Sequence, residues 1–254
     1  MSRWQVHEYN PDFYILRQSG CVHYEKPFLY LIFGEERALL EDTGAGAADP
    51  AAVVEPLLAQ WSERNGKPGT VPLTVVHSHS HGDHVAGDRH FDDDVEIVPP
   101  AVDRIPVAFG IDNWPTETGQ IDLGDRVVDV IPIPGHDDAG LALYDRRTGL
   151  LLTGDSLYPG RIYVSEEDFF AFVESTQRLV DFTRDRPVAH ILGTHIEQTR
   201  TPFVDYPRGT QYQPNEHSLE MSRGVLLELN TALTALDGIL KEVALRDITL
   251  SPIR

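Results

Sequence analysis

The feature that most constrains the fold of this chain is a strand-end pattern that recurs five times. At each occurrence a short apolar run stops, a loop containing glycine follows, and a His or Asp stands in the loop. These positions are Asp42, His79 to His84, His136, Asp155 and His195. In open α/β sheets ligands bind beyond the ends of strands, so we expect the five loops to converge on one site.

The segments between these loops predict alternating strands and helices. Apolar runs typical of buried strands cover 28–33, 38–40, 73–76, 127–133, 141–144, 150–152 and 188–192. Helices are expected from Asp49 to about Asn65, from a Ser165 N-cap to Pro187, and over about 217–243. Pro56 should kink or shorten the first helix because proline removes a helical hydrogen bond. The alternation favours an α/β fold with a mixed sheet.

Nothing in the sequence divides the chain into separate units. Of its 254 residues 41% are apolar and 24% are charged, which is typical of a globular chain with a sizeable core. There is no Pro/Gly/Ser-rich linker, short repeat or low-complexity tract. We therefore predict a single domain over 1–254, with a C-terminal helical segment at about 217–243.

Charge and cysteine content exclude several classes of protein. Forty acidic against 21 basic residues give a net charge of −19, which would repel a nucleic-acid backbone. With no run of 18 apolar residues and no basic and apolar leader, we expect a cytoplasmic protein without a membrane partner. Cys21 is the single cysteine, so a thiolate-rich metal site is excluded. Any metal must be held by nitrogen and oxygen.

The densest of the five loops reads His79-Ser80-His81-Gly82-Asp83-His84. Residues two apart in an extended segment point the same way, so His79 and His81 can face one cation. Asp83 and His84 follow at a turn and can face a second cation. Imidazole and carboxylate ligands suit Zn²⁺, and also Mn²⁺ or Fe²⁺. The alternative interpretation is a histidine-rich surface loop or a run of capping residues.

This motif resembles the His-x-His-x-Asp-His signature of the metallo-β-lactamase fold superfamily, whose members include glyoxalase II, lactonases and class B3 β-lactamases. The later loops match the family in its order: Asp42, Pro134-Gly135-His136, Thr153-Gly154-Asp155 and Gly193-Thr194-His195. The resemblance covers nearly the whole chain. It implies an αββα sandwich, in which two mixed β-sheets are flanked by helices.

The resemblance also implies a binuclear metal site, most simply two Zn²⁺ ions. One ion would be held by His79, His81 and His136, the other by Asp83, His84 and His195, and Asp155 would bridge them. Each ion keeps a position for water, which a catalytic site requires. Asp42 would orient the ligand loops by hydrogen bonding without touching metal. His77 is expected to be a strand-end histidine and not a further ligand.

The implied activity is hydrolysis of an ester-like bond in a small-molecule substrate by a metal-bridging hydroxide. The candidate bonds are thioester, lactone, amide and phosphoester, in that order. Asp83 and Tyr158 are the catalytic candidates. In the superfamily's acyl-homoserine-lactone lactonases a tyrosine at this spacing faces the substrate carbonyl, so Tyr158 either donates a hydrogen bond there or packs beneath its loop. Tyr158, Tyr212 and His217 are the candidate substrate contacts.

Several alternatives stay open at the level of sequence. The family's persulfide dioxygenases use one iron held by two His and an Asp, and this chain contains those ligands too. A non-catalytic metal-binding protein is a further alternative, and so is a homodimer. Glyoxalase II is less favoured, because Arg223 and Lys241 are the only cations in the segment from Glu220 to Glu242. We expect specificity to reside in the loops 101–120 and 200–217.

Overall fold

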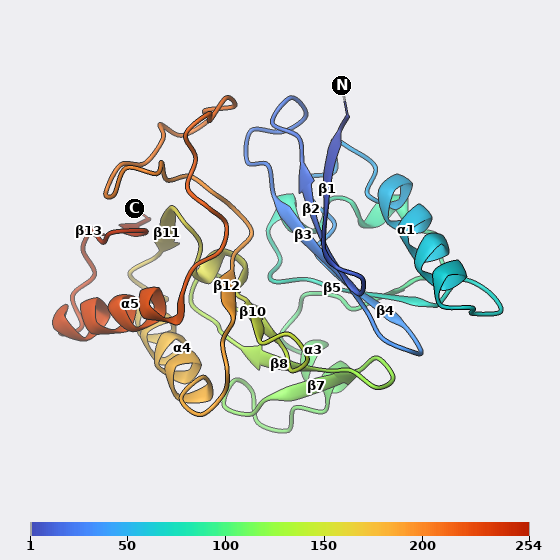
Figure 1. Ribbon diagram of the computed structural model, residues 1–254. Coiled ribbons are helices and arrows are strands. Elements are labelled where there is room, and N and C mark those ends of the chain that lie inside the picture. Colours follow the sequence, from blue (N-terminus) through green and yellow to red (C-terminus); the bar gives the residue numbers. More distant parts are fainter. Residues whose placement is uncertain (1, 254) are drawn as a thin grey trace.

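The computed structural model describes residues 2–253 and shows two large β-sheets packed face to face (Figure 1). The first sheet holds six strands in sequence order: β1 (Trp4–Asn10), β2 (Phe13–Gln18), β3 (Phe28–Phe33), β4 (Ala38–Glu41), β5 (Leu73–Val76) and β6 (Glu96–Ile97). Strands β1 to β4 pair antiparallel, whereas β4, β5 and β6 pair parallel. The sheet is therefore mixed.

The second sheet has the order β12-β10-β9-β8-β7. Its strands are β7 (Gly119–Asp122), β8 (Val127–Pro132), β9 (Leu141–Asp145), β10 (Leu150–Leu152) and β12 (His190–Leu192). Only β10 and β12 pair parallel, so this sheet is also mixed. A third sheet, absent from the sequence prediction, joins β11 (Arg161–Val164), β14 (Thr249–Pro252) and β13 (Val243–Ala244).

Helices cover the outer faces of both large sheets. Helix α1 (Ala51–Arg64) lies on the first sheet, while α4 (Phe169–Phe182) and α5 (Arg223–Ala235) lie on the far side of the second (Figure 1). The remaining helical segments are α2 (Gly82–Val85), α3 (Ile105–Phe109), η1 (Asp88–His90) and η2 (Gly154–Ser156). The predicted αββα sandwich of two mixed sheets is confirmed.

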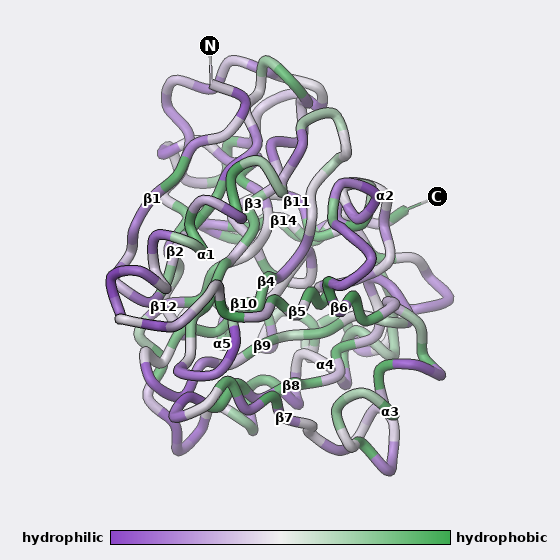
Figure 2. The backbone as a smooth tube through the Cα atoms, turned by 90° about the vertical axis from the view of Figure 1, so that its right-hand side faces the viewer, coloured by the Kyte–Doolittle hydropathy of each residue, from purple (hydrophilic) through white to green (hydrophobic). Residues whose placement is uncertain are grey.

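Apolar side chains form three layers that follow this order. Along β3, Tyr30 and Ile32 face the second sheet, whereas Leu29 and Leu31 face α1. A third cluster packs α4 and α5 against the outer face of the second sheet. Strands buried on both faces need continuous apolar runs, which explains the unbroken sequence of β3. Figure 2 shows these hydrophobic strands at the centre of the molecule, with hydrophilic loops around them.

The predicted C-terminal helix is wrong in extent, because α5 begins at Arg223 and ends at Ala235. Before it, Met221 forms antiparallel backbone hydrogen bonds of 2.8 and 3.0 Å with Ile191, so this stretch extends the sheet. After it, Asp237 and Gly238 have φ values of 48° and 80°. Left-handed residues end a helix, which leaves the later part of the leucine stripe outside it.

Two further helix boundaries differ from the prediction. Helix α4 begins after Asp168, and Ser165 is not its N-cap; the Ser165 hydroxyl instead donates to the Asp168 carboxylate (2.6 Å) in the preceding turn. The helix also ends at Phe182, before Pro187. Helix α1 runs through Pro56 over 14 residues, so the expected shortening is wrong. Pro56 lies on the exposed face of α1, where its ring meets solvent.

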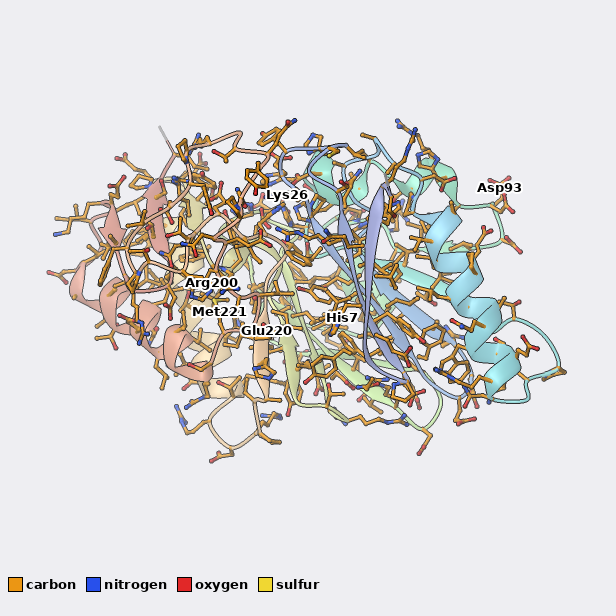
Figure 3. All side chains as sticks on the ribbon, turned by 45° about the horizontal axis from the view of Figure 1, so that its top comes forward. His7, Lys26, Asp93, Arg200, Glu220 and Met221 are labelled. Atoms are coloured by element: carbon orange, nitrogen blue, oxygen red, sulfur yellow. The ribbon has the colours of Figure 1, made fainter. Side chains whose placement is uncertain are left out.

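The acidic residues are spread over the surface. Asp93, for example, projects from the turn before β6 at one edge of the molecule (Figure 3). No helix in residues 2–253 is long and apolar enough to cross a bilayer.

Candidate metal centre

Strand ends from both large sheets bring the predicted ligands together. His79 and His81 follow β5, and Asp83 and His84 lie in the short helix α2. The second sheet contributes His136 after β8, Asp155 after β10 in η2, and His195 after β12. Because these strands end at the same edge of the sandwich, residues up to 116 positions apart in sequence meet in one place.

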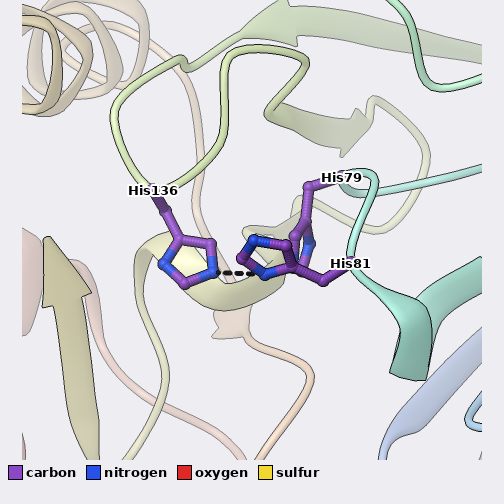
Figure 4. A group of neighbouring side chains, drawn as sticks. All are labelled: His79, His81 and His136. Atoms are coloured by element: carbon purple, nitrogen blue, oxygen red, sulfur yellow. Dashed lines mark hydrogen bonds between the residues drawn. The ribbon is translucent and has the colours of Figure 1, made fainter. Parts of the chain in front are cut away.

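The first cluster consists of three imidazoles (Figure 4). His81 Nδ1 lies 3.0 Å from His79 Nε2 and 3.2 Å from His136 Nε2. The three ring nitrogens face one another, and no carboxylate lies among them. Nitrogen atoms arranged in this way can coordinate a metal ion. The arrangement therefore fits a metal ion held by nitrogen.

The second cluster consists of one carboxylate, that of Asp83, and the imidazoles of His84 and His195. Asp83 Oδ2 lies 3.2 Å from both His84 Nε2 and His195 Nε2. His84 Nε2 is buried and has no hydrogen-bond partner among the described residues. A buried ring nitrogen without a hydrogen-bond partner, next to a carboxylate and a second imidazole, is a suitable ligand for a second metal ion.

Asp155 lies between the two clusters and presents one oxygen to each. Its Oδ1 is 3.3 Å from His195 Nε2, whereas its Oδ2 is 3.7 Å from His136 Nε2 and 3.9 Å from His79 Nε2. The Thr194 hydroxyl donates to Oδ1 and holds the carboxylate in this orientation. The geometry is that of a carboxylate able to bridge two cations.

Hydrogen bonds on the outer side of the rings orient them. His136 Nδ1 donates to the Tyr163 carbonyl (2.8 Å) and His195 Nδ1 donates to the Glu25 carbonyl (3.0 Å). Since a carbonyl can only accept, the proton of each neutral ring is on Nδ1 and the lone pair is on Nε2. Both rings are thereby prepared as Nε2 ligands.

Asp42 supports the second cluster from behind. Its Oδ2 lies 2.7 Å from His84 Nδ1 and accepts from the Ser78 hydroxyl (2.8 Å), and its Oδ1 accepts from the Ser78 amide (2.7 Å). The residue is buried and has φ +66°. His77 is also buried, with Nε2 3.3 Å from Asp88, and belongs to none of the ligand clusters of residues 2–253.

The two clusters differ in protonation. Burial lowers the pKa of His79 and His136, which keeps both imidazoles neutral. Burial acts the same way on His195, but the carboxylates of Asp155 and Asp83 outweigh it and raise the His195 pKa to about 9. The second cluster therefore holds a proton that a metal ion would displace on binding.

A pocket of about 320 Å³ opens onto the ligands. Its walls include ligand side chains from both clusters, the loop residues Tyr24 and Glu25, residues 206–210 and Gln213. Ile196 and Ile253 add apolar surface. A molecule bound here would therefore contact the metal ligands.

Of the three residues predicted to contact substrate, only Tyr158 lines the pocket. Tyr158 lines the pocket and its ring centre is 5.5 Å from that of His195, but its hydroxyl donates to the Arg161 carbonyl and to Glu197 (3.2 Å). Its hydroxyl is thus engaged away from a substrate carbonyl. Tyr212 is 81% exposed, and neither it nor His217 lines the pocket.

The loop predictions are corrected in part. The loop 200–217 does reach the pocket, through residues 206–210 and Gln213. The loop 101–120 contributes no lining residue, because Ile105 and Phe109 pack into the core between the sheets. Tyr24, Glu25, Tyr163 and Ile253 were missed, and no local sequence signal marks them.

Comparison with known sequences agrees with this site. A family profile described as the metallo-beta-lactamase superfamily matches residues 88–195. The human acyl-coenzyme A thioesterase MBLAC2 is 26% identical over 201 residues, which cover 66% of this chain and 72% of that protein. A hydroxyacylglutathione hydrolase from Synechococcus is 30% identical over 131 residues; the match covers 47% of this chain and 46% of that enzyme.

Solved structures share the fold over almost the full length. A metallo-beta-lactamase from Pontibacter korlensis superposes with a TM-score of 0.60 at 16% identity, covering 91% of this chain and 99% of that one. TMB-1 superposes with a TM-score of 0.59 at 12% identity, covering 93% and 100%. These solved structures show the shared fold. The family profile and the related sequences, with the His/Asp ligand clusters, identify the chain as a metallo-hydrolase of the metallo-beta-lactamase superfamily.

Proposed function

We propose that the protein is a dizinc hydrolase of small-molecule thioesters. The observation that carries the proposal is Asp155, whose two carboxylate oxygens face two separate ligand clusters. A mononuclear iron site of two His and one Asp would leave one of these clusters without a role. Zn²⁺ is the metal proposed because the three imidazoles of the first cluster match the three-histidine set of catalytic zinc sites.

The residues of the site have separate roles in the proposed reaction. The outer hydrogen bonds of His136 and His195 direct Nε2 of both rings inward, and Asp155 spans the two positions. When bound, the two cations supply a water of lowered pKa and polarise the carbonyl oxygen of the substrate. Asp83 lines the pocket, where its ionised carboxylate would accept a hydrogen bond from the attacking water and orient it; the proton released from that water would go to the leaving thiolate.

Support for the thioester comes from the pocket and from two relatives. One relative is named a thioesterase and the other hydrolyses an acyl-glutathione. Ile196, Ile253 and the ring of Tyr158 offer an acyl group apolar contact beside the ligands. We propose a small-molecule partner and, given the charge of −19, no nucleic-acid partner. A homodimer and a cytoplasmic location stay predictions.

The proposal is tested by metal analysis and turnover on the same sample. Protein purified without chelator should contain about two zinc ions per chain and should hydrolyse simple acyl thioesters. Asp155→Asn should lose more than about 100-fold in kcat and reduce the bound zinc, because this carboxylate faces both clusters and even residues that only orient metal ligands cost about 10- to 100-fold. Asp185→Asn, on an exposed loop, is the matched control and should behave as wild type.

Three outcomes contradict the proposal. Metal content well below one ion per chain removes the basis for any metal chemistry here. One iron with oxygen uptake on a glutathione persulfide indicates the dioxygenase alternative. Two metals with no turnover of thioesters, lactones, amides or phosphoesters indicate a metal-binding protein.

A further inference from the structure

One positively charged side chain in the pocket wall, that of Arg208, has no carboxylate partner among the described residues. Among the residues from 2 to 253, Arg208 is the sole Lys or Arg that lines the pocket. No described carboxylate lies within 4.0 Å of its guanidinium group, which instead lies 4.4 Å from the centre of the Tyr163 ring.

The other charges around this part of the pocket are already engaged. Glu197 accepts from the Arg161 amide (3.1 Å) and lies 3.5 Å from the Arg161 guanidinium. Arg161 also donates to the Tyr206 carbonyl (2.6 Å) and lies 3.7 Å from Asp205. Glu25 accepts from the Tyr24 hydroxyl (2.7 Å). The charge of Arg208 is therefore the one left available to a ligand.

The segment that carries Arg208, residues 206–215, is held in shape before any ligand binds. The Tyr206 amide donates to the Glu197 carbonyl (2.7 Å), and the Asn215 amide donates to the Tyr206 hydroxyl (2.9 Å), which closes the segment on itself. Inside it, the Thr210 hydroxyl donates to the Pro207 carbonyl (2.6 Å). A preformed loop binds a ligand with less loss of conformational freedom.

Arg208 also has a defined position relative to the metal ligands. Its guanidinium group lies on the ring of Tyr163, and the carbonyl of the same tyrosine accepts from His136 Nδ1. Tyr163 therefore separates Arg208 from the first ligand cluster. A substrate whose reacting carbonyl lies at the ligands can place another group at Arg208.

We propose that Arg208 selects thioesters that carry an anionic group, a carboxylate or a phosphate, at a distance from the reacting carbonyl. The proposal rests on the function proposed above and names its substrate class. A planar guanidinium group binds either anion through paired hydrogen bonds. Elsewhere the acidic surface repels anions, so binding of such a substrate depends strongly on this one residue.

The test uses three thioesters with one acyl group and different thiol ends: a carboxylate, a phosphate and a neutral carboxamide. Arg208→Ala should raise KM by about tenfold or more for an anionic substrate, with kcat within about twofold, because a hydrogen bond to a charged group is lost. KM for the carboxamide should stay unchanged. Arg208→Lys should restore part of the affinity, and Arg246→Ala, an exposed arginine outside the pocket, is the matched control.

A binding measurement separates this inference from the proposed function. Unreactive thioether analogues with the same three ends are titrated calorimetrically into metal-loaded wild type and Arg208→Ala. Selective weakening of the carboxylate or the phosphate analogue identifies the anion that Arg208 recognises. Equal effects of Arg208→Ala on all three analogues overturn the inference even if thioesters are hydrolysed. Absence of all thioester turnover by wild type overturns the proposed function instead.

Discussion

At the scale of single residues, the site depends on side chains that do not themselves face the pocket. The Asp42 carboxylate bonds at once to the Ser78 amide, the Ser78 hydroxyl and His84 Nδ1. His84 is buried, and its other nitrogen, Nε2, points into the second ligand cluster. Asp42 thus sets the orientation of one ligand through its outer nitrogen.

Replacing Asp42 with Asn should therefore weaken metal binding without removing a ligand. The amide oxygen can still accept one hydrogen bond, but the negative charge beside His84 is lost. We expect zinc affinity to fall by about 10- to 100-fold, as for comparable positioning residues. Competition with a chromogenic chelator measures this change, and Asp185→Asn provides a surface control. Unchanged zinc affinity in Asp42→Asn would show that Ser78 alone positions His84.

At the scale of secondary-structure elements, a buried arginine that is paired within the second sheet also hydrogen-bonds to the first sheet, at the edge away from the ligands. Arg126, just before β8, pairs with Asp145 at the end of β9 through contacts of 3.0 and 2.5 Å. It also donates to the carbonyls of Phe33, at the end of β3, and Asp12. The side chains of Arg126 and Asp145 are fully buried.

Arg126→Ala should lower the free energy of unfolding by about 3–5 kcal/mol, because it leaves the Asp145 charge buried and unpaired. Arg37→Ala is the matched control: this arginine also pairs with an acid, Glu96, but the two side chains are 42% and 63% exposed, so a loss of at most about 1 kcal/mol is expected. Urea denaturation measures both. Equal losses in the two variants would mean that the burial of the Arg126–Asp145 pair does not add to stability.

At the scale of the whole molecule, the site connects the two halves of the sandwich. Its ligands come from loops of both sheets, and they meet only in the folded chain. A metal that binds the folded state alone shifts the folding equilibrium toward it. The native fold and the bound metal are therefore coupled.

Removal of metal by chelation should lower Tm, and re-addition of Zn²⁺ should restore it. At a free zinc concentration about 1,000 times Kd, the expected stabilisation is about 4 kcal/mol. Differential scanning calorimetry measures the shift, with Ca²⁺ as the control ion because it prefers oxygen ligands. A Tm that does not respond to chelation would contradict the coupling.

The same titration should depend on pH. Without metal, His195 has a pKa of about 9 and is protonated at pH 7, so zinc must displace its proton. Apparent zinc affinity should therefore rise with pH as His195 loses its proton near pH 9. His84, whose pKa the carboxylates of Asp42 and Asp155 raise against the effect of burial, adds to this dependence. Calorimetric titration in buffers of different ionisation enthalpy detects the released proton.

The candidate metal ligands and most of the central strands could be predicted from the sequence alone. The spacing of His79, His81, Asp83 and His84 after an apolar strand is local, and so are the runs that became β3, β5 and β9. Local patterns of this kind depend on a few neighbouring residues, and the strands are buried on both faces, which makes them unbroken apolar runs.

The ends of the last helix and the walls of the pocket depend on tertiary contacts. The leucine spacing continues beyond α5 on both sides, but pairing of Met221 with Ile191 and left-handed residues after Ala235 limit the helix. Likewise, Arg208 meets Tyr163 only because the segment 206–215 packs against strand β11. Such contacts depend on how the whole chain packs, so no short stretch of sequence contains them.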